Sequence, residues 1–245
     1  MNIDGGVLQT FEQVNIKEKL EISRDFQGLI VFKKSTKYIK YINLFFKRIM
    51  DVLGAIVGIL ILIPLTIIVK IANVLNKDYG PLFYSQERIG QYGKNFKMYK
   101  FRSMIENADE KLKELLEKDE EARKEYNTYK KLKNDPRVTP IGKFIRKTSL
   151  DEFPQFINVL KGEMSLVGPR AYLPQEEDDM GETFQIIVSH KPGITGLWQI
   201  SGRSDVTFKD RLEIDLFYHE NQNTLLDLKI LFKTFSAVLN RNGAE

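Results

Sequence analysis

The chain has 245 residues, 42% of them hydrophobic and 29% charged, which is a globular composition and excludes wholesale disorder and a transporter with many spans. It contains no cysteine and only two histidines, which excludes thiolate catalysis, disulfides and the usual zinc sites, so a bound metal would have oxygen ligands. The formal net charge of +4 favours a partner that carries phosphates or an anionic membrane surface.

The N-terminal third of the sequence predicts a polar tail followed by a membrane element. Residues 1–40 show no strong periodicity and are expected to form the tail, and residues 41–76 are expected to enter the membrane. Within them, residues 52–69 contain 18 consecutive uncharged residues, the length at which a membrane helix is expected. The preceding stretch, residues 31–50, has six Lys and Arg and no acidic residue, which indicates a cytoplasmic flank.

Pro64 divides this apolar run and predicts a kink, because proline removes a backbone donor and clashes with the preceding turn. The two arms would rise about 18 Å and about 16 Å, each near half of a hydrocarbon core about 30 Å thick. This pattern is compatible with a re-entrant helix-break-helix and equally with a kinked span. A buried core helix is the less favoured interpretation.

Residues 77–245 predict a compact, helix-rich α+β domain. Two short strands are expected on either side of a turn at Gly90–Gly93, where the apolar residues alternate. Residues 105–133 predict a charged helical insert with one apolar stripe that covers the domain. Further helices are expected within residues 141–160, 211–218 and 225–239.

Asp151 and Glu152 form an adjacent acidic pair in the stretch RKTSLDEFPQF. Ser149 and Glu152 match a capping box, which needs no function and is favoured by the local sequence alone. Alternatively, Pro154 occupies the first helical position and the pair lies just outside the helix. Either placement puts Asp151 near the positive end of a helix, which also suits a nucleophile or a metal ligand.

Two arginines that lie next to glycine or proline, together with two cations in the stretch YKFRS, favour an anion pocket. Glycine lets the backbone approach a ligand closely, and the guanidinium group binds two phosphate oxygens at once. These residues are Lys100 and Arg102 in YKFRS, Arg170 in GPR and Arg203 in GR. Trp198, the only tryptophan, either stacks on a ligand ring or packs in the core.

Five stretches in register carry a family resemblance: KRIMDVLGAIVGILILIPL, QERIGQYGKNFKMYKFRSM, KNDPRVTPIGKFIRKTSLDEFPQFINVLKGEMSLVGPR, KPGITGLWQISGR and DLKILFKT. From about Lys47 to Gly243, the chain resembles the bacterial sugar transferases, which are monotopic phosphoglycosyl transferases that use polyprenyl phosphate. The resemblance implies a re-entrant membrane helix kinked at Pro64, amphipathic interfacial helices, and a cytosolic domain on the cytoplasmic face of the inner membrane.

The resemblance also implies an activity. Asp151 would attack a UDP-sugar, form a phosphosugar-aspartyl intermediate and release UMP, after which polyprenyl (undecaprenyl) phosphate would accept the hexose-1-phosphate. Magnesium would bind at Asp151, and Glu152 would support the metal or activate the acceptor. The matching positions for binding phosphate, nucleotide or metal are Lys100, Arg102, Arg146, Arg170, Arg203 and Asp215.

The favoured sugars are galactose and glucose, the pathway is the initiation of polysaccharide or glycan assembly, and no nucleic acid partner is expected. A homo-oligomer is left open. Two alternatives remain at this point: direct transfer in a ternary complex, with Asp151 only a ligand, and a membrane-tethered basic adaptor without catalysis.

Overall fold

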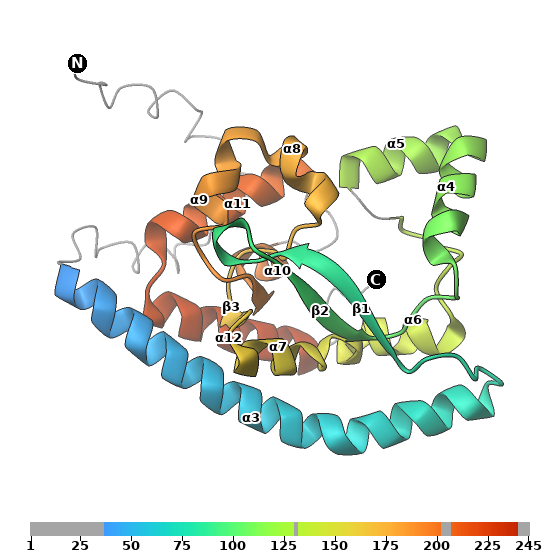
Figure 1. Cartoon of the computed structure of the whole chain (residues 1–245), viewed down its shortest axis with the longest axis horizontal. Coiled ribbons are helices and arrows are strands. Elements are labelled where there is room, and N and C mark those ends of the chain that lie inside the picture. The colour runs from blue at the N-terminus through green and yellow to red at the C-terminus, as the bar shows by residue number, and fades with distance from the viewer. Residues whose placement is uncertain (1–36, 130–131, 202–206, 240–245) are drawn as a thin grey trace.

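The computed structural model describes residues 37–129, 132–201 and 207–239, except the side chains of 37–40 and 239. Most of the predicted N-terminal tail and Arg203 lie outside these residues. Helices dominate, and two small sheets complete the fold, which confirms the predicted helix-rich α+β class. One long helix, α3 (Lys37–Leu75), forms a curved base, and the other elements lie on its concave side (Figure 1).

The helix α3 bends at its centre but does not break. It runs for 39 residues with Pro64 inside it, so the predicted helix-break-helix is one continuous helix in this structure. Pro64 is exposed, and its missing backbone hydrogen bond allows the helix to curve away from it. At 1.5 Å per residue α3 is about 58 Å long, about twice the thickness of a hydrocarbon core.

The inner face of α3 packs against the domain along most of its length. Its buried side chains recur every three or four residues, as in an amphipathic helix; they include Ala55, Leu62, Leu65 and Val69. Gly58 lies so close to α7 (Gln155–Lys161) that a Cβ atom there would collide with the Phe156 ring. The base helix and the domain therefore form one packed unit.

Two strand pairs lie above this base. β1 (Phe83–Ile89) and β2 (Asn95–Phe101) form the predicted antiparallel hairpin, with Phe83 opposite Phe101. The turn between them is the 3-10 helix η2 (Gln91–Gly93). β3 (Ser165–Val167) and β4 (Gly193–Thr195) pair in parallel, and α3, α7 and α12 (Thr224–Leu239) contact β3.

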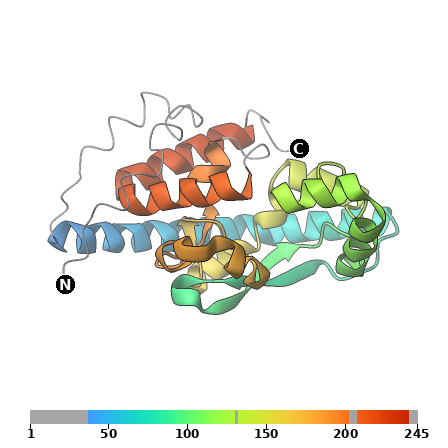
Figure 2. The same cartoon turned by 90° about the horizontal axis from the view of Figure 1, so that it is seen from above.

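Short helices and turns complete the described part of the chain. They are α4 (Ala108–Lys118), α5 (Glu120–Tyr129), α6 (Pro140–Lys147), η3 (Leu150–Glu152), η4 (Pro174–Glu176), α8 (Glu177–Met180), η5 (Gly181–Thr183), α9 (Phe184–Ile187), α10 (Leu197–Ile200), α11 (Phe208–Asn221) and α12 (Thr224–Leu239). In Figure 2, which looks at the molecule from above, α11 and α12 lie on one side of α3 and the hairpin lies on the other. The predicted helices near 211–218 and 225–239 are thus confirmed and are longer than expected.

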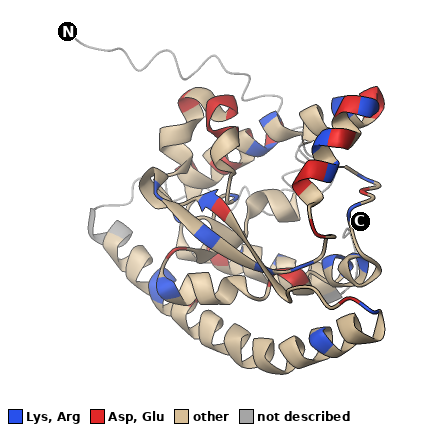
Figure 3. Cartoon of the chain, turned by 45° about the vertical axis from the view of Figure 1, so that its right-hand side comes forward, with Lys and Arg blue, Asp and Glu red and all other residues tan. Residues whose placement is uncertain are grey.

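The predicted charged insert is the helix pair α4 and α5. Acidic and basic residues cover both helices (Figure 3). Neither helix contains a fully buried residue, and the stripe residues Leu112, Leu115 and Leu116 are half-buried. The insert projects beside the domain and packs chiefly on itself.

Three clusters of buried apolar residues form the core. One joins β3, α11 and α12 to Ala55 of α3, and a second joins the end of β1 to α8, α9 and α11. The third packs the C-terminal half of α3 against Phe101 of β2 and Ile145 of α6. The acidic pair Asp151 and Glu152 lies on η3, which contacts both α6 and β2.

Candidate active site

The turn that carries Asp151 is shaped by the residues around it. Ser149 adopts a left-handed conformation with φ 56°, and its side chain makes no capping bond, so the capping-box interpretation is wrong. Pro154 is the N-cap residue of α7, which leaves the acidic pair just before that helix, as the second interpretation of the sequence placed it. Asp151 is thereby held on a single 3-10 turn between two helices.

Asp151 is buried beside two cations. Only 7% of its surface is exposed, and this burial raises the pKa of its carboxyl to about 6. The negative charge of Glu152 also raises the pKa, whereas the positive charges of Lys100 and Arg146 lower it. A carboxylate with this pKa is ionised at neutral pH yet poorly solvated, which suits it to attack an electrophile or to bind a cation.

Lys100 and Arg146 reach this pair from different elements. The Lys100 Nζ atom of β2 donates to Glu152 Oε1 at 2.9 Å. Arg146 near the end of α6 donates from Nε to the Ser103 hydroxyl at 2.8 Å. Four of the predicted residues, Asp151, Glu152, Lys100 and Arg146, are therefore gathered in one place.

Arg102 is not directed at the acidic pair. Its guanidinium pairs with Asp78 and donates to the backbone carbonyls of Pro81 and Met104. These bonds tie the segment that follows α3 to the end of β2. In this structure Arg102 stabilises the base of the hairpin.

Asp215 and Arg170 belong to a second cluster at the loop after β3. Asp215 of α11 is fully buried, and burial raises the pKa of its carboxyl to about 7. Its Oδ2 atom accepts hydrogen bonds from the Arg170 backbone N–H at 3.1 Å and from the Tyr172 hydroxyl at 2.8 Å. Asp215 therefore positions the loop that carries Arg170.

Two further arginines, Arg88 and Arg211, complete this second cluster and were not among the predicted site residues. Arg88 of β1 donates to the Ala171 carbonyl at 2.8 Å. The Arg211 guanidinium of α11 lies 4.8 Å from the centre of the Trp198 ring, and that of Arg170 lies at 5.6 Å. Arg211 precedes Asp215 by one helical turn, a spacing that places both on one helix face and that the sequence does display.

The acidic pair fits a magnesium ion by its chemistry. Magnesium in phosphate-transfer sites is bound through one or two carboxylates together with substrate phosphates. Asp151 and Glu152 supply two adjacent carboxylates, and the Glu152 side chain is only partly exposed. No group of three or more His, Asp or Glu ligands occurs among the described residues, so the phosphates would have to complete the shell.

Comparison with known proteins gives consistent matches over most of the chain. A family model described as bacterial sugar transferase matches residues 42–241. The chain is 48% identical over 200 residues to the undecaprenyl-phosphate galactose phosphotransferase of Salmonella typhimurium, a match that covers 82% of this chain and 42% of that protein. It is 38% identical over 213 residues to the UDP-glucose:undecaprenyl-phosphate glucose-1-phosphate transferase of Klebsiella pneumoniae, with the same two coverages.

A shorter relative aligns over most of both chains. The exopolysaccharide production protein ExoY of Sinorhizobium fredii is 44% identical over 198 residues, which cover 81% of this chain and 87% of ExoY. The chain thus spans less than half the length of the Salmonella and Klebsiella relatives and corresponds more closely in size to ExoY.

Proposed function

This chain belongs to the bacterial sugar transferase family, and on that basis we propose that it transfers a hexose-1-phosphate from a UDP-sugar to polyprenyl phosphate and releases UMP. The observation that carries the proposal is the buried carboxylate of Asp151 beside Lys100 and Arg146. The arrangement puts a candidate nucleophile beside two positive charges in a site that is shielded from water, which suits phosphoryl transfer.

The proposed reaction has two steps. An oxygen of Asp151 attacks the phosphorus that carries the sugar, and the bond from that phosphorus to the UMP oxygen breaks. An oxygen of polyprenyl phosphate then attacks the phosphorus of the aspartyl phosphosugar, which frees Asp151 and leaves the sugar on a lipid diphosphate. Lys100 and Arg146 are suited to bind the phosphate oxygens and to stabilise the charge that develops on them.

Asp151 and Glu152 would hold the magnesium ion proposed for this site, and the ion would offset the charge of the phosphates. Glu152 then has two candidate roles, support of the metal and activation of the acceptor phosphate. Its bond to Lys100 fixes one carboxylate oxygen and leaves the other available for either role.

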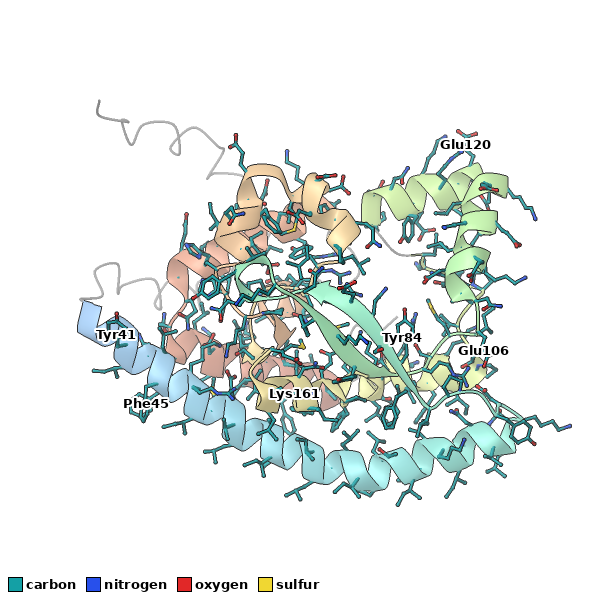
Figure 4. The ribbon with its side chains drawn as sticks, in the orientation of Figure 1. Tyr41, Phe45, Tyr84, Glu106, Glu120 and Lys161 are labelled. Atoms are coloured by element: carbon teal, nitrogen blue, oxygen red, sulfur yellow. The ribbon has the colours of Figure 1, made fainter. Side chains whose placement is uncertain are left out.

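The base helix supports attachment to one face of a membrane. Residues Tyr41–Leu75 are long and apolar enough to cross a bilayer, but α3 packs lengthwise on the domain. Its outer edge carries a row of apolar side chains, among them Phe45, and almost no charge (Figures 3 and 4). We therefore propose that the outer edge of α3 is embedded in the membrane. Both ends of the helix then lie on the same membrane face as the domain.

The helix α12 has the features of an interfacial helix and supports the same orientation of the protein at the membrane. It contacts α3 and exposes Leu225, Leu228, Phe232, Phe235 and Val238. The basic flank before the apolar run favours the cytoplasmic face of the inner membrane. A lipid phosphate at the membrane surface would then lie on the same side of the protein as the domain that carries Asp151.

The donor is proposed to carry galactose or glucose, the sugars in the names of the Salmonella and Klebsiella relatives. A panel of UDP-sugars, with UMP release from membrane fractions as the readout, identifies which one is used. The pathway proposed is the initiation of an exported polysaccharide.

The decisive test is exchange of labelled UMP into the UDP-sugar without any lipid acceptor. A covalent intermediate predicts exchange in the wild-type protein and none in Asp151→Asn, whereas Asp178→Asn, a substitution of an exposed residue on α8, should exchange normally. If wild-type protein transfers sugar phosphate to the lipid but shows no exchange, the covalent route is wrong. Turnover retained by Asp151→Asn would favour direct transfer in a ternary complex.

A further inference from the structure

Three guanidinium groups from separate elements gather at the loop after β3, and two of them lie against the single tryptophan. They belong to Arg88 of β1, Arg170 after β3 and Arg211 of α11, and Trp198 of α10 lies against the last two. Arg88 and Arg211 are only 9% and 3% exposed. Within the described part of the chain, the Nε atom of each arginine and the Trp198 indole N–H are buried without a hydrogen-bond partner.

The positive charge of this cluster is only partly balanced by the described carboxylates, of which the buried Glu176 acts on both Arg88 and Arg211. None of the three arginines forms an ion pair with a described Asp or Glu. Asp215 is nearby, but burial holds its pKa at about 7, so it carries only part of a negative charge at neutral pH. Burial, together with the charge of Arg170, lowers the pKa of both Arg88 and Arg211 to about 10.

Buried charges of one sign are costly unless a group of opposite sign pairs with them. Guanidinium groups with unused donors bind phosphate oxygens particularly well, because their planar forks match the geometry of the anion. The cluster therefore has the composition of a phosphate site: three cations face Glu176 and a partly charged Asp215, and no described carboxylate forms an ion pair with them.

Arg88, at the far end of β1, lies within electrostatic reach of the acidic pair. Arg88 lies on the same hairpin face as Lys100, because Tyr84, which is opposite Lys100, precedes Arg88 by four residues. Four residues of a strand span about 13 Å, and the charge of Glu152 still acts on Arg88. The far end of β1 approaches α8, α9 and α11 rather than α3 (Figure 1).

We propose that Arg88, Arg170 and Arg211, the last two against Trp198, form a phosphate site that binds the nucleotide half of the donor, the part that leaves as UMP. The identity of the nucleotide rests on the proposed function. In this proposal Arg88 and Arg211 bind the phosphates of the donor nucleotide. A lipid phosphate offers the same chemistry but would approach from α3, so the position of the cluster favours the soluble nucleotide.

The test uses Trp198 as a built-in reporter, since it is the only tryptophan of the chain. The full chain in detergent micelles is titrated with UMP, and its tryptophan emission is recorded. A saturable change is expected with UMP and not with uridine, which lacks the phosphate. Arg88→Gln and Arg211→Gln should weaken UMP binding about tenfold to a hundredfold, whereas Arg123→Gln on exposed α5 should not change it.

Conservative variants separate charge from geometry. Arg88→Lys and Arg211→Lys keep the charge but lose the planar fork, so they should restore UMP affinity only in part. A glutamine variant that fails to fold would show a shifted tryptophan emission maximum. In that case the UMP affinity of the wild type is compared with that of the lysine variants alone. Equal UMP affinity in wild type and in all folded arginine variants would overturn the proposal.

Two further comparisons show which ligand supplies the phosphate and whether the proposed function fails independently of the phosphate site. Saturation of the same tryptophan signal by a short-chain polyprenyl phosphate, with no response to UMP, would assign the cluster to the lipid and overturn the proposal. UMP binding that depends on the arginines without UMP exchange in the wild type would support the phosphate site and refute the covalent function. UMP exchange that the arginine substitutions leave unchanged would support the covalent function and refute the phosphate site.

Discussion

Replacing Asp151 by Asn is expected to stabilise the fold while it removes the proposed nucleophile. Burial raises the pKa of Asp151 from 3.8 to about 6, so the folded chain holds the ionised carboxylate less favourably than the unfolded chain does. Asparagine has nearly the same shape and no charge. The substitution should therefore remove an energetic cost that the wild-type protein bears at neutral pH.

The size and sign of this effect follow from the two pKa values. A difference of about two pKa units corresponds to about 3 kcal/mol of unfolding free energy. Because the folded-state value is the higher one, the cost is complete well above pH 6, declines as the pH falls through about 6, and disappears below 3.8. For a domain of this size, about 3 kcal/mol corresponds to an increase in Tm of about 6–12 °C.

The measurement is thermal unfolding of the full chain in detergent, without divalent cations, over a series of pH values between 4 and 8. Asp178→Asn, which removes an exposed carboxylate, serves as the matched control and should leave Tm unchanged. Millimolar magnesium should raise the Tm of the wild type more than that of Asp151→Asn, because the cation would bind the ionised carboxylate. A wild-type protein as stable as Asp151→Asn at pH 7.5 would refute the reasoning that burial dominates at this residue.

Three other outcomes are expected. The rate of UMP exchange should rise as the pH increases through about 6, because the ionised form of Asp151 is the nucleophile, and a rate that is flat between pH 5 and 7 would contradict this. Lys47→Met should lower the unfolding free energy by about 3–5 kcal/mol in urea denaturation, because it leaves Asp227, which is fully buried and 2.9 Å from Lys47 Nζ, without its cation. Adding Asp227→Asn should recover part of that loss. The pair Ile67→Asp and Ile71→Asp, on the outer edge of α3, should release the protein from lipid vesicles in flotation assays while its Tm stays near the wild-type value.

Local sequence patterns predicted the elements that depend on neighbouring residues. The alternation around Gly90–Gly93 predicted the hairpin, and helical spacing predicted α11 and α12. Gly162, the left-handed C-cap of α7 with φ 83°, ends that helix in the way that glycine commonly does. These features are determined by backbone preferences within a few residues, so the sequence displays them directly.

The features that sequence patterns missed depend on residues far apart in the chain. The S-x-x-E pattern at Ser149 predicted a capping box, but Glu152 bonds to Lys100, 52 positions away. Arg88 and Arg211 were not selected because they lie far apart in the chain, in β1 and α11, and no local pattern joins them. Only the packing of β1 against α11 and the loop after β3 brings them to one place.

The lengthwise packing of α3 has a consequence for how the protein matures after synthesis. Asp51, on the inner face of α3, accepts hydrogen bonds from the Ser165 hydroxyl and the Leu166 N–H, more than 110 positions later in the chain. In lipid without those partners, a charged Asp51 would cost about 2.5–3.5 kcal/mol. Translation must proceed well past residue 166 before Asp51 of α3 can accept these two hydrogen bonds. The apolar segment therefore emerges from the ribosome long before it can reach its final packing, which depends on the folding of the segment that contains Ser165 and Leu166.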